Sequence, residues 1–289
     1  MKPALSDPAL RRRIEASRPG RRIFLSDFDG TLAPIVPDFL KARSGRGVEA
    51  GIAELEKAGW RVVLLTGRGL KDLRSRIRTK GLVCGGNHGW EWTGGMAFAP
   101  GQPSAQVKRS VRRSVRNAAR LLRAKVGHIP GVQVEEKLYF AAVHYRLMPA
   151  FRSAEFERAL LSARRDPGLA GLRWRAGKKI WELLSPVRWG KGEAARLLIR
   201  RFRPDLVVAA GDDTTDEEMF AAVGKKGVSV RVGRSERTRA GLYVERQTDM
   251  VRLMRLMASC GRLRPVRSRT SRPRTTRSGR RPSRGRSSR

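Results

Sequence analysis

Short apolar runs, separated by amphipathic helical segments, constrain the fold of this chain more than any other feature. The runs are residues 23–26 (IFLS), 61–65 (RVVLL), 82–85, 206–210 (LVVAA) and 228–232. The helical segments are residues 48–58, 190–202, 216–223 and 248–259. Strands of a parallel sheet are buried on both faces, so they are apolar throughout and are joined by helices. The alternation therefore predicts an α/β class with a Rossmann-like parallel sheet.

The stretch from residue 101 to residue 185 breaks this alternation. Residues 104–126 predict one long helix, with an apolar stripe opposite a face rich in Arg and Lys. Strand-like runs then flank a predicted helix at 150–164; they are residues 132–135, 139–145, 172–175 and 179–184. We interpret 101–185 as a second α/β domain inserted into the first, whose two parts are residues 21–100 and 186–260.

The positive charge is spread over the whole chain and is densest at its end. The chain has 289 residues, 40% of them hydrophobic, and 63 Lys and Arg against 26 Asp and Glu. Residues 262–289 contain 12 Arg and no acidic residue. Such a segment cannot bury a core, so we predict a disordered Arg-rich tail over 261–289 and an N-terminal extension over 1–20. The tail either binds polyanions weakly and in a salt-dependent manner or has no function.

Several classes of protein are excluded by what the sequence lacks. No run of 18 apolar residues is present, so we expect no membrane partner. The first 22 residues contain no continuous apolar stretch, which argues against a secretory signal. Cys84 and Cys260 are too few for a disulfide framework or a Cys-rich zinc site. A reducing, cytoplasmic setting is the expectation.

Acidic residues directly follow two of the predicted strands. Asp27 and Asp29 stand after the first strand, in DFDGTL, and Asp212 and Asp213 stand after the fourth, in GDDTTDE. Ligands of an open parallel sheet bind outside the carboxyl ends of its strands, so these carboxylates should meet there. A hard cation such as Mg²⁺ would relieve their mutual repulsion. One such pair often only forms a turn or caps a helix, but two pairs in equivalent places favour a site.

Two further features could hold a phosphoryl group. Thr66 and Gly67 follow the strand at 61–65 and offer a hydroxyl and free backbone N–H groups. Lys191 begins a helical segment and could supply a positive charge to the same oxygens. Alone, TGR is a common turn and Lys191 would be a surface residue. The order of all four pieces along the chain is what indicates a site.

In this order, the four motifs resemble those of the haloacid-dehalogenase-like phosphohydrolases. A narrower resemblance, to the trehalose-6-phosphate phosphatases, extends over about residues 21–258. It rests on DGTLAPI at 29–35, HGWE at 88–91, VHYR at 143–146, GKKIWE at 177–182 and the final GDDTTDE. The chain departs from the family's usual residues at four positions, which are Leu184, Ser185, Arg188 and Gly190.

The resemblance implies a hydrolase core with a substrate-recognising cap, and it implies roles for the motif residues. Asp27 would be the nucleophile that forms an aspartyl-phosphate. Asp29 would be the general acid and base. Thr66, Gly67 and Lys191 would hold the phosphoryl oxygens. The implied Mg²⁺ ligands are Asp27, Asp29, Asp212 and Asp213.

The inserted domain would then hold the sugar of a small sugar phosphate. The expected contacts are Lys178 and Glu182 foremost, His144 and Arg146 next, and His88 and Glu91 from the core. Three of these residues could instead have no contact with the substrate. His144 could face the cap interior, Glu182 could share the apolar face of its strand, and Lys178 could be a charged loop residue.

Two alternatives remain open from the sequence. The first is a phosphatase of another sugar phosphate, such as a sucrose phosphate or a mannosyl-glycerate phosphate. The second is a nucleic-acid-binding protein on a phosphatase-like scaffold, which the net charge of +37 motivates. No RRM, KH or zinc-finger pattern accompanies that charge. Trehalose-6-phosphate hydrolysis, as the last step of trehalose synthesis, is the favoured reading, and the sequence gives no signal for an oligomeric state.

Overall fold

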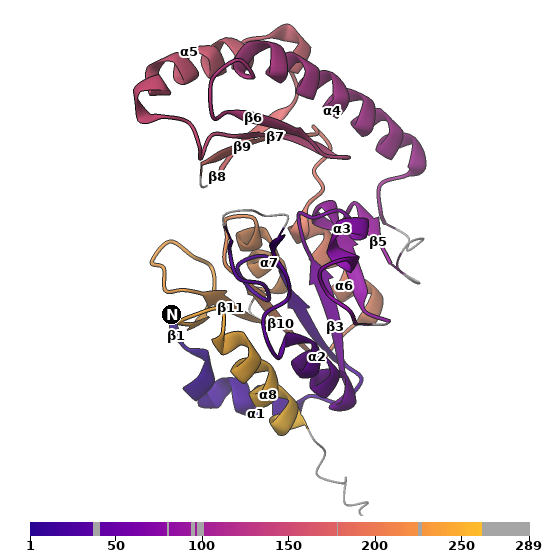
Figure 1. Ribbon diagram of the computed structural model, residues 1–289. Helices are drawn as coiled ribbons and strands as arrows, with labels where there is room; N and C mark the ends of the chain where they lie inside the picture. Colours follow the sequence, from indigo (N-terminus) through magenta and orange to yellow (C-terminus); the bar gives the residue numbers. More distant parts are fainter. Residues whose placement is uncertain are drawn as a thin grey trace, which may run out of the picture.

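The computed structural model describes residues 1–36, 41–79, 81–93, 96, 101–177, 179–224 and 227–261. The described chain forms a core with an eight-stranded sheet and, above it, a cap with a four-stranded sheet (Figure 1). The predicted α/β class is confirmed. Of the Arg-rich tail predicted over 261–289, residues 262–289 lie outside the described residues, and Gly261 ends the last helix. Among the described helices, none combines the length and the apolar character needed to cross a membrane.

The core sheet has the strand order β1-β12-β11-β10-β2-β3-β4-β5, and only the β4–β5 pair is antiparallel. Its strands are β1 (Lys2–Pro3), β2 (Arg22–Ser26), β3 (Trp60–Leu65), β4 (Val83–Gly86), β5 (Glu91–Trp92), β10 (Leu206–Gly211), β11 (Val228–Val232) and β12 (Leu242–Val244). The central strands β2 and β10 are buried along their whole length, which explains their continuous apolar sequence.

Helices cover both faces of this sheet. Their bounds are α1 (Pro8–Ala16), α2 (Val48–Lys57), α3 (Leu70–Arg74), α6 (Lys191–Phe202), α7 (Asp216–Val223) and α8 (Asp249–Gly261). One apolar cluster joins α1, α2, α3 and α8 to the sheet, and a second joins α6 and α7 to the opposite face. The core is therefore a three-layer sandwich, as the alternation of strands and helices predicts.

The first 20 residues are part of this core rather than an appendage to it. Leu10 and Ile14, one turn apart on α1, are buried against α8. The buried guanidinium of Arg22 donates to the carbonyl of Ile14, 2.8 Å away, and to that of Gly261, 3.1 Å away. These two carbonyls lie at the carboxyl ends of α1 and α8, where helices leave acceptors unsatisfied. One arginine thus ties both helix ends to β2.

The cap is built from α4 (Ala105–Val126), β6 (Gln133–Glu136), β7 (Phe140–His144), α5 (Ser153–Arg164), β8 (Arg173–Gly177) and β9 (Ile180–Leu184). Its antiparallel sheet has the order β6-β7-β9-β8. The helices α4 and α5 pack on one face of the sheet and form a separate apolar cluster with it. Figure 1 shows that the other face of the sheet is turned toward the core.

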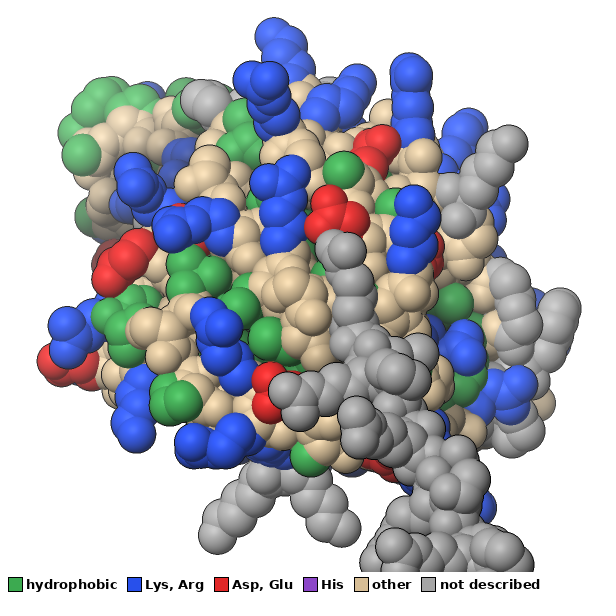
Figure 2. All heavy atoms as spheres, turned by 90° about the horizontal axis from the view of Figure 1, so that it is seen from below, with side chains coloured by type: hydrophobic (Ala, Val, Ile, Leu, Met, Phe, Trp, Pro, Cys, Tyr) green, Lys and Arg blue, Asp and Glu red, His purple; other side chains and the backbone are tan. Residues whose placement is uncertain are grey.

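Basic side chains cover the end of the core that is farthest from the cap. Figure 2 shows Lys and Arg standing out over much of this face, with few Asp and Glu between them. The charge of the chain is therefore not confined to its last 28 residues, in agreement with the residue counts.

Candidate active site

The two acidic motifs meet at the carboxyl ends of neighbouring strands. Strand β10 pairs with β2 in parallel, with Ala210 opposite Ser26. The next residue, Asp27, donates its backbone N–H to the Ala210 carbonyl at 2.9 Å, which continues the ladder by one step. Asp27 and Asp212 therefore leave the sheet side by side, as the sequence predicts.

A buried ammonium group lies between two carboxylates at this point. Lys191 is the first residue of α6, and its Nζ is 2.8 Å from Asp27 Oδ1 and 2.8 Å from Asp216 Oδ1. Burial alone would lower the pKa of Lys191, but Asp216 and Asp27 together raise it above its usual value. Burial raises the pKa of Asp27 well above its usual range, and the positive charge of Lys191 opposes this. The single positive charge of Lys191 therefore acts on three acidic residues, which are Asp27, Asp216 and Asp212.

Asp27, Asp212 and Asp216 could hold a metal ion, because one oxygen of each lies within 4.8 Å of the others. Burial, and then the charge of Asp216, raises the pKa of Asp212 to about 7. Two buried carboxyl groups and a partly buried one beside one lysine leave an excess of negative charge that a hard divalent cation would neutralise. The donor set therefore fits such an ion.

In the structure, Asp216 rather than Asp213 is the buried third aspartate of the GDDTTDE motif. Asp213 is exposed, and its carboxylate accepts the Thr214 backbone N–H at 2.7 Å, within its own turn. Asp216, which the sequence analysis did not select, is fully buried at the start of α7. Its Oδ2 accepts the backbone N–H groups of Asp212 at 2.9 Å and Asp213 at 3.0 Å. Asp216 thus shapes the turn that presents Asp212 and also holds Lys191.

Asp29 lies on the turn after β2 and is held by an arginine. Arg68 donates two 2.7 Å hydrogen bonds to the Asp29 carboxylate and a third, also of 2.7 Å, to Asp72. The turn needs a glycine at position 30, where φ is +76° and an added Cβ would lie 2.1 Å from Asp212 Oδ2. The turn after β2 and the turn after β10 are therefore in direct contact.

The predicted phosphate loop follows β3. Thr66 is buried, and its Oγ1 accepts the backbone N–H of Arg68 at 3.1 Å. Gly67 packs on the ring of His88, which an added Cβ would approach to 3.0 Å. Burial lowers the pKa of His88 well below its usual value, and the positive charges of Arg175 and Lys191 add to this. A neutral imidazole therefore covers the loop.

The register of the cap sheet decides which cap side chains face the core. Alternate residues of a strand point to opposite faces. Ala141, Val143 and Leu183 belong to the cap's apolar cluster, so their strand neighbours His144 and Glu182 lie on the other face, toward the core. His144 Nε2 is 2.9 Å from Glu135 Oε2, and Glu182 Oε1 is 3.9 Å from His88 Nε2.

Two of the three remaining predicted contacts, Arg146 and Glu91, lie among the described residues. Arg146 is exposed beyond the end of β7. Glu91 accepts a 2.8 Å hydrogen bond from Asn87 Nδ2 on the rim of the core. Lys178 lies outside the described residues.

Three charged residues in this region were not predicted from the sequence; strand alternation could have identified Glu135 and Arg175, whereas Lys137 lies in the turn after β6. Lys137 Nζ is 3.5 Å from Glu135 Oε1, and Glu135 also contacts His144 across the strand pair β6–β7. Arg175 Nε donates to Glu182 Oε2 at 2.7 Å across β8–β9. These residues add charged groups to the core-facing side of the cap.

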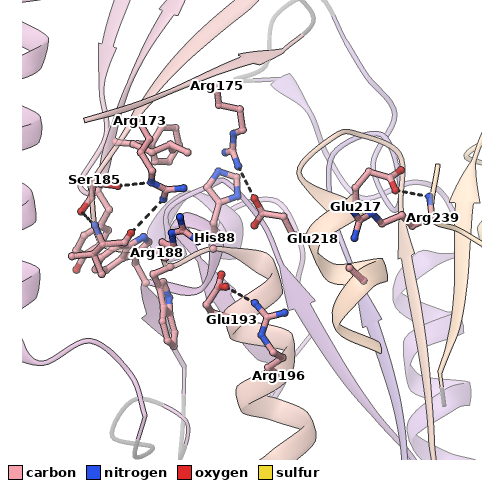
Figure 3. A pocket seen from close by; sticks show the side chains of 18 residues that line it. His88, Arg173, Arg175, Ser185, Arg188, Glu193, Arg196, Glu217, Glu218 and Arg239 are labelled. Carbon is pink, nitrogen blue, oxygen red and sulfur yellow. Dashed lines mark hydrogen bonds and ion pairs between the residues drawn. The ribbon is translucent and has the colours of Figure 1, made fainter. Parts of the chain in front are cut away.

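A cavity of about 390 Å³ lies where the cap joins the core. Its walls come from β8 and β9 of the cap, from α6 and α7 of the core, and from the segment between β9 and α6 (Figure 3). Charged side chains line it, among them Arg173, Arg175, Arg188, Glu217 and Glu218. His88 stands in its wall, between the cavity and the phosphate loop.

The fold and the acidic site define a capped phosphohydrolase core of the haloacid-dehalogenase-like class. The trehalose-phosphatase family model matches residues 25–247. The chain therefore belongs to the trehalose-phosphatase family.

Curated relatives agree with this assignment. The chain is 36% identical over 216 residues to a trehalose-phosphate phosphatase of Mycobacterium marinum, which covers 73% of the chain and 53% of the relative. It is 33% identical over 211 residues to one of Mycobacterium tuberculosis, covering 71% of the chain and 52% of the relative. The chain thus spans about half the length of these curated relatives.

Among solved structures, the C-terminal domain of Candida albicans trehalose-6-phosphate phosphatase has the same fold, with a TM-score of 0.70. The two chains are 22% identical, and the match covers 90% of this chain and 98% of that one. The sucrose-phosphatase of Synechocystis, solved with sucrose and phosphate, has a TM-score of 0.51 at 13% identity and covers 82% of this chain and 98% of that one.

Proposed function

We propose that the protein hydrolyses trehalose 6-phosphate to trehalose and phosphate. The observation that carries this proposal is the Asp27–Lys191–Asp216 arrangement, with Lys191 Nζ 2.8 Å from both carboxylates, beneath a cap whose sheet turns one face toward the core (Figure 1). Membership of the trehalose-phosphatase family supports the choice of substrate.

Asp27 is the proposed nucleophile. Its carboxylate would attack phosphorus, the bond to the sugar oxygen would break, and an aspartyl-phosphate would form. Water would then attack this phosphorus, which releases phosphate and restores the carboxylate. Lys191, in contact with the attacking carboxylate, keeps it oriented and offsets negative charge beside the phosphoryl group.

Asp29 is the proposed general acid and base. It would protonate the leaving sugar oxygen in the first step and accept a proton from water in the second. Arg68 holds this carboxylate with two 2.7 Å hydrogen bonds, so the pair must loosen before Asp29 can exchange a proton. Thr66 and Gly67, beneath the ring of His88, are the proposed holders of the phosphoryl oxygens.

We propose Mg²⁺ as the cofactor, held by Asp27 and Asp212 with the Asp29 carbonyl. When bound, the ion would neutralise the phosphoryl charge and the surplus of carboxylates. Asp216 already uses both oxygens, one toward Lys191 and one toward two backbone N–H groups. Asp216 therefore positions its neighbours, and Asp213 is left as a supporting residue on the rim.

The sugar would lie against the core-facing side of the cap. Glu182 and His144 are on that side, together with Glu135 and Lys137, and carboxylates and ammonium groups suit sugar hydroxyls. Arg146 and Lys178 remain proposed contacts at the end of this sheet, and His88 and Glu91 remain proposed contacts from the core.

Two subsidiary proposals concern the rest of the chain. The unpaired Cys84 and Cys260 support a reducing, cytoplasmic setting. The Arg-rich tail would bind polyanions weakly, with a steep dependence on salt. A nucleic-acid-binding protein on this scaffold is the less favoured reading, since the sequence carries the expected residue at every proposed catalytic position.

A substrate panel tests the proposed function. Phosphate release would be measured from trehalose 6-phosphate, sucrose 6-phosphate and glucose 6-phosphate, each with Mg²⁺ and with EDTA. We expect metal-dependent release, with kcat/KM highest for trehalose 6-phosphate. A higher kcat/KM for sucrose 6-phosphate would support the proposed phosphatase mechanism but contradict trehalose 6-phosphate as the preferred substrate. No release from any of the three would overturn the proposal.

A further inference from the structure

Arg175 lies on the edge strand of the cap sheet, with its side chain toward the core. Strand β8 pairs with β9 so that Arg175 stands opposite Glu182. The neighbouring Trp174 and Trp181, whose ring centroids are 6.3 Å apart, pack on the cap's apolar cluster. Because successive side chains point to opposite faces, Arg175 and Glu182 share the face that is turned to the core.

One guanidinium joins a cap carboxylate to a core carboxylate. Arg175 Nε donates to Glu182 Oε2 at 2.7 Å, and Arg175 Nη1 is 3.7 Å from Glu218 Oε1 on α7. Figure 3 shows the Arg175 side chain reaching across the cavity to Glu218, with the ring of His88 beside it. The side chains of Arg175 and Glu182 are only 19% and 12% exposed, so solvent screens their contact weakly.

Glu218 lies against the part of the core that carries the buried lysine. An added Cβ at Gly190 would lie 2.8 Å from Glu218 Oε2, and one at Gly192 would lie 3.0 Å from the Glu218 carbonyl oxygen. These two glycines flank Lys191, and Glu218 itself is two residues beyond Asp216. The core end of the Arg175 contact therefore lies beside the start of α6, next to the backbone that carries Lys191.

The cap end of the contact leads to the phosphate loop. Glu182 accepts from Arg175 with one oxygen, and its other oxygen is 3.9 Å from His88 Nε2. The His88 ring in turn packs on Gly67. A continuous series of side chains thus runs from α7 through Arg175 and Glu182 to the loop after β3.

We propose, on the basis of the function proposed above, that Arg175 is a positioning residue that sets the closed state of the cap. It fixes the Glu182 carboxylate for a sugar hydroxyl, and it holds β8 down on α7 through Glu218. Loss of this contact would weaken the use of a sugar phosphate, which needs the cap. It would leave phosphoryl transfer from a small aryl phosphate unchanged, because that substrate needs the core alone.

Kinetics of four variants, with Arg175→Lys as the conservative one, test this role. Arg175→Gln removes the charge, Glu218→Gln removes the core partner, and the double variant removes both. Arg188→Gln is the matched control, since Arg188 is an exposed arginine that lines the same cavity. For trehalose 6-phosphate we expect Arg175→Gln to lower kcat/KM about tenfold, mainly through KM, and Arg175→Lys to recover part of the loss. For p-nitrophenyl phosphate we expect changes below about twofold in every variant.

The double variant tells whether Arg175 and Glu218 act through their mutual contact or independently. If Arg175 acts through Glu218, the double variant loses no more kcat/KM than Arg175→Gln alone. Equal losses on both substrates, fully additive losses, or an equal loss in Arg188→Gln would overturn the assignment. A wild-type protein inactive on trehalose 6-phosphate but active on the aryl phosphate would instead overturn the proposed substrate.

A measurement without substrate tests the closed state directly. Trypsin cleavage after Arg188, in the segment between β9 and α6, would be followed by mass spectrometry. We expect cleavage several times faster in Arg175→Gln than in the wild type, because the cap opens more often. Equal cleavage rates would contradict the role of Arg175 in holding the cap, whatever the substrate is.

Discussion

Replacing Asp212 with Asn should stabilise the metal-free protein while abolishing its use of the metal. Burial and the charge of Asp216 raise the pKa of Asp212 from 3.8 to about 7. The folded protein therefore keeps the Asp212 proton at pH values where the unfolded chain has lost it. Stability falls as the pH rises from about 4 to about 7, and the loss is complete above about pH 7.

The magnitude follows from that difference in pKa. A change from 3.8 to about 7 corresponds to about 4 kcal/mol of unfolding free energy. Asp212 is partly exposed, so solvent screens part of this cost, and we expect a gain of about 2 kcal/mol at pH 8. The variant keeps one contact, because an Asn carbonyl can accept from Thr31 Oγ1 as the carboxylate does at 3.1 Å.

Urea unfolding in EDTA measures this gain. We expect a higher midpoint at unchanged m for Asp212→Asn at pH 8, and a gain at least halved at pH 4.5. Asp213→Asn, at the exposed neighbour, is the control and should change stability by less than about 0.5 kcal/mol. Added Mg²⁺ should stabilise the wild type more than Asp212→Asn. A variant less stable than the wild type at pH 8, or an equal gain at both pH values, would refute the reasoning.

Three further substitutions test the site. Asp27→Asn removes the proposed nucleophile, so kcat for trehalose 6-phosphate should fall by about 10⁴ or more in a steady-state assay, and near-normal turnover would exclude Asp27. Lys191→Met leaves Asp27 and Asp216 without the ammonium that lies 2.8 Å from each, so urea unfolding at pH 8 should show a loss of about 3–5 kcal/mol; an unchanged midpoint would contradict the buried ion pair. Gly30→Ala forces an alanine to a φ of +76° and a Cβ onto Asp212, so kcat should fall at least about 100-fold with Mg²⁺ present, and an active variant would show that the two turns can separate.

The catalytic end of the core could be predicted because its strands are apolar along their whole length. Strands β2 and β10 stand out in the sequence, and in a parallel sheet their carboxyl ends lie at the same edge. The direct pairing of β10 with β2 then places Asp27 beside Asp212. Lys191 could be predicted only from its place in the order of motifs. Its burial between two carboxylates depends on how α6 packs against α7.

The N-terminal helix and Asp216 show what sequence patterns left out. Leu10 and Ile14 have helical spacing, but the resemblance begins near residue 21, so α1 was not expected to pack on α8. GDDTTDE holds three aspartates, and the backbone of one turn decides which of them point inward. That turn buries Asp216 and leaves Asp213 exposed, because the Asp216 carboxylate accepts hydrogen bonds from backbone N–H groups of the same turn.

Which cap residues face the core depends on strand register, and the sequence indicates register only through the alternation of apolar and polar residues. The apolar residues of β7 and β9 correctly place Glu182 away from the cap interior, once Leu183 and Val143 are known to be buried there. The contact of Arg175 with Glu218 joins residues of two domains. This contact depends on the distance between cap and core, which no local sequence pattern predicts.

Trapping the covalent intermediate tests the central proposal most directly. Trehalose 6-phosphate labelled with ³²P would be mixed with excess enzyme and Mg²⁺, quenched in acid within milliseconds, and the labelled peptide identified by mass spectrometry. We predict label on Asp27, its loss on a longer chase at the rate of phosphate release, and no label in Asp27→Asn. Rapid phosphate release without any labelled protein, or label on another residue, would contradict the proposal.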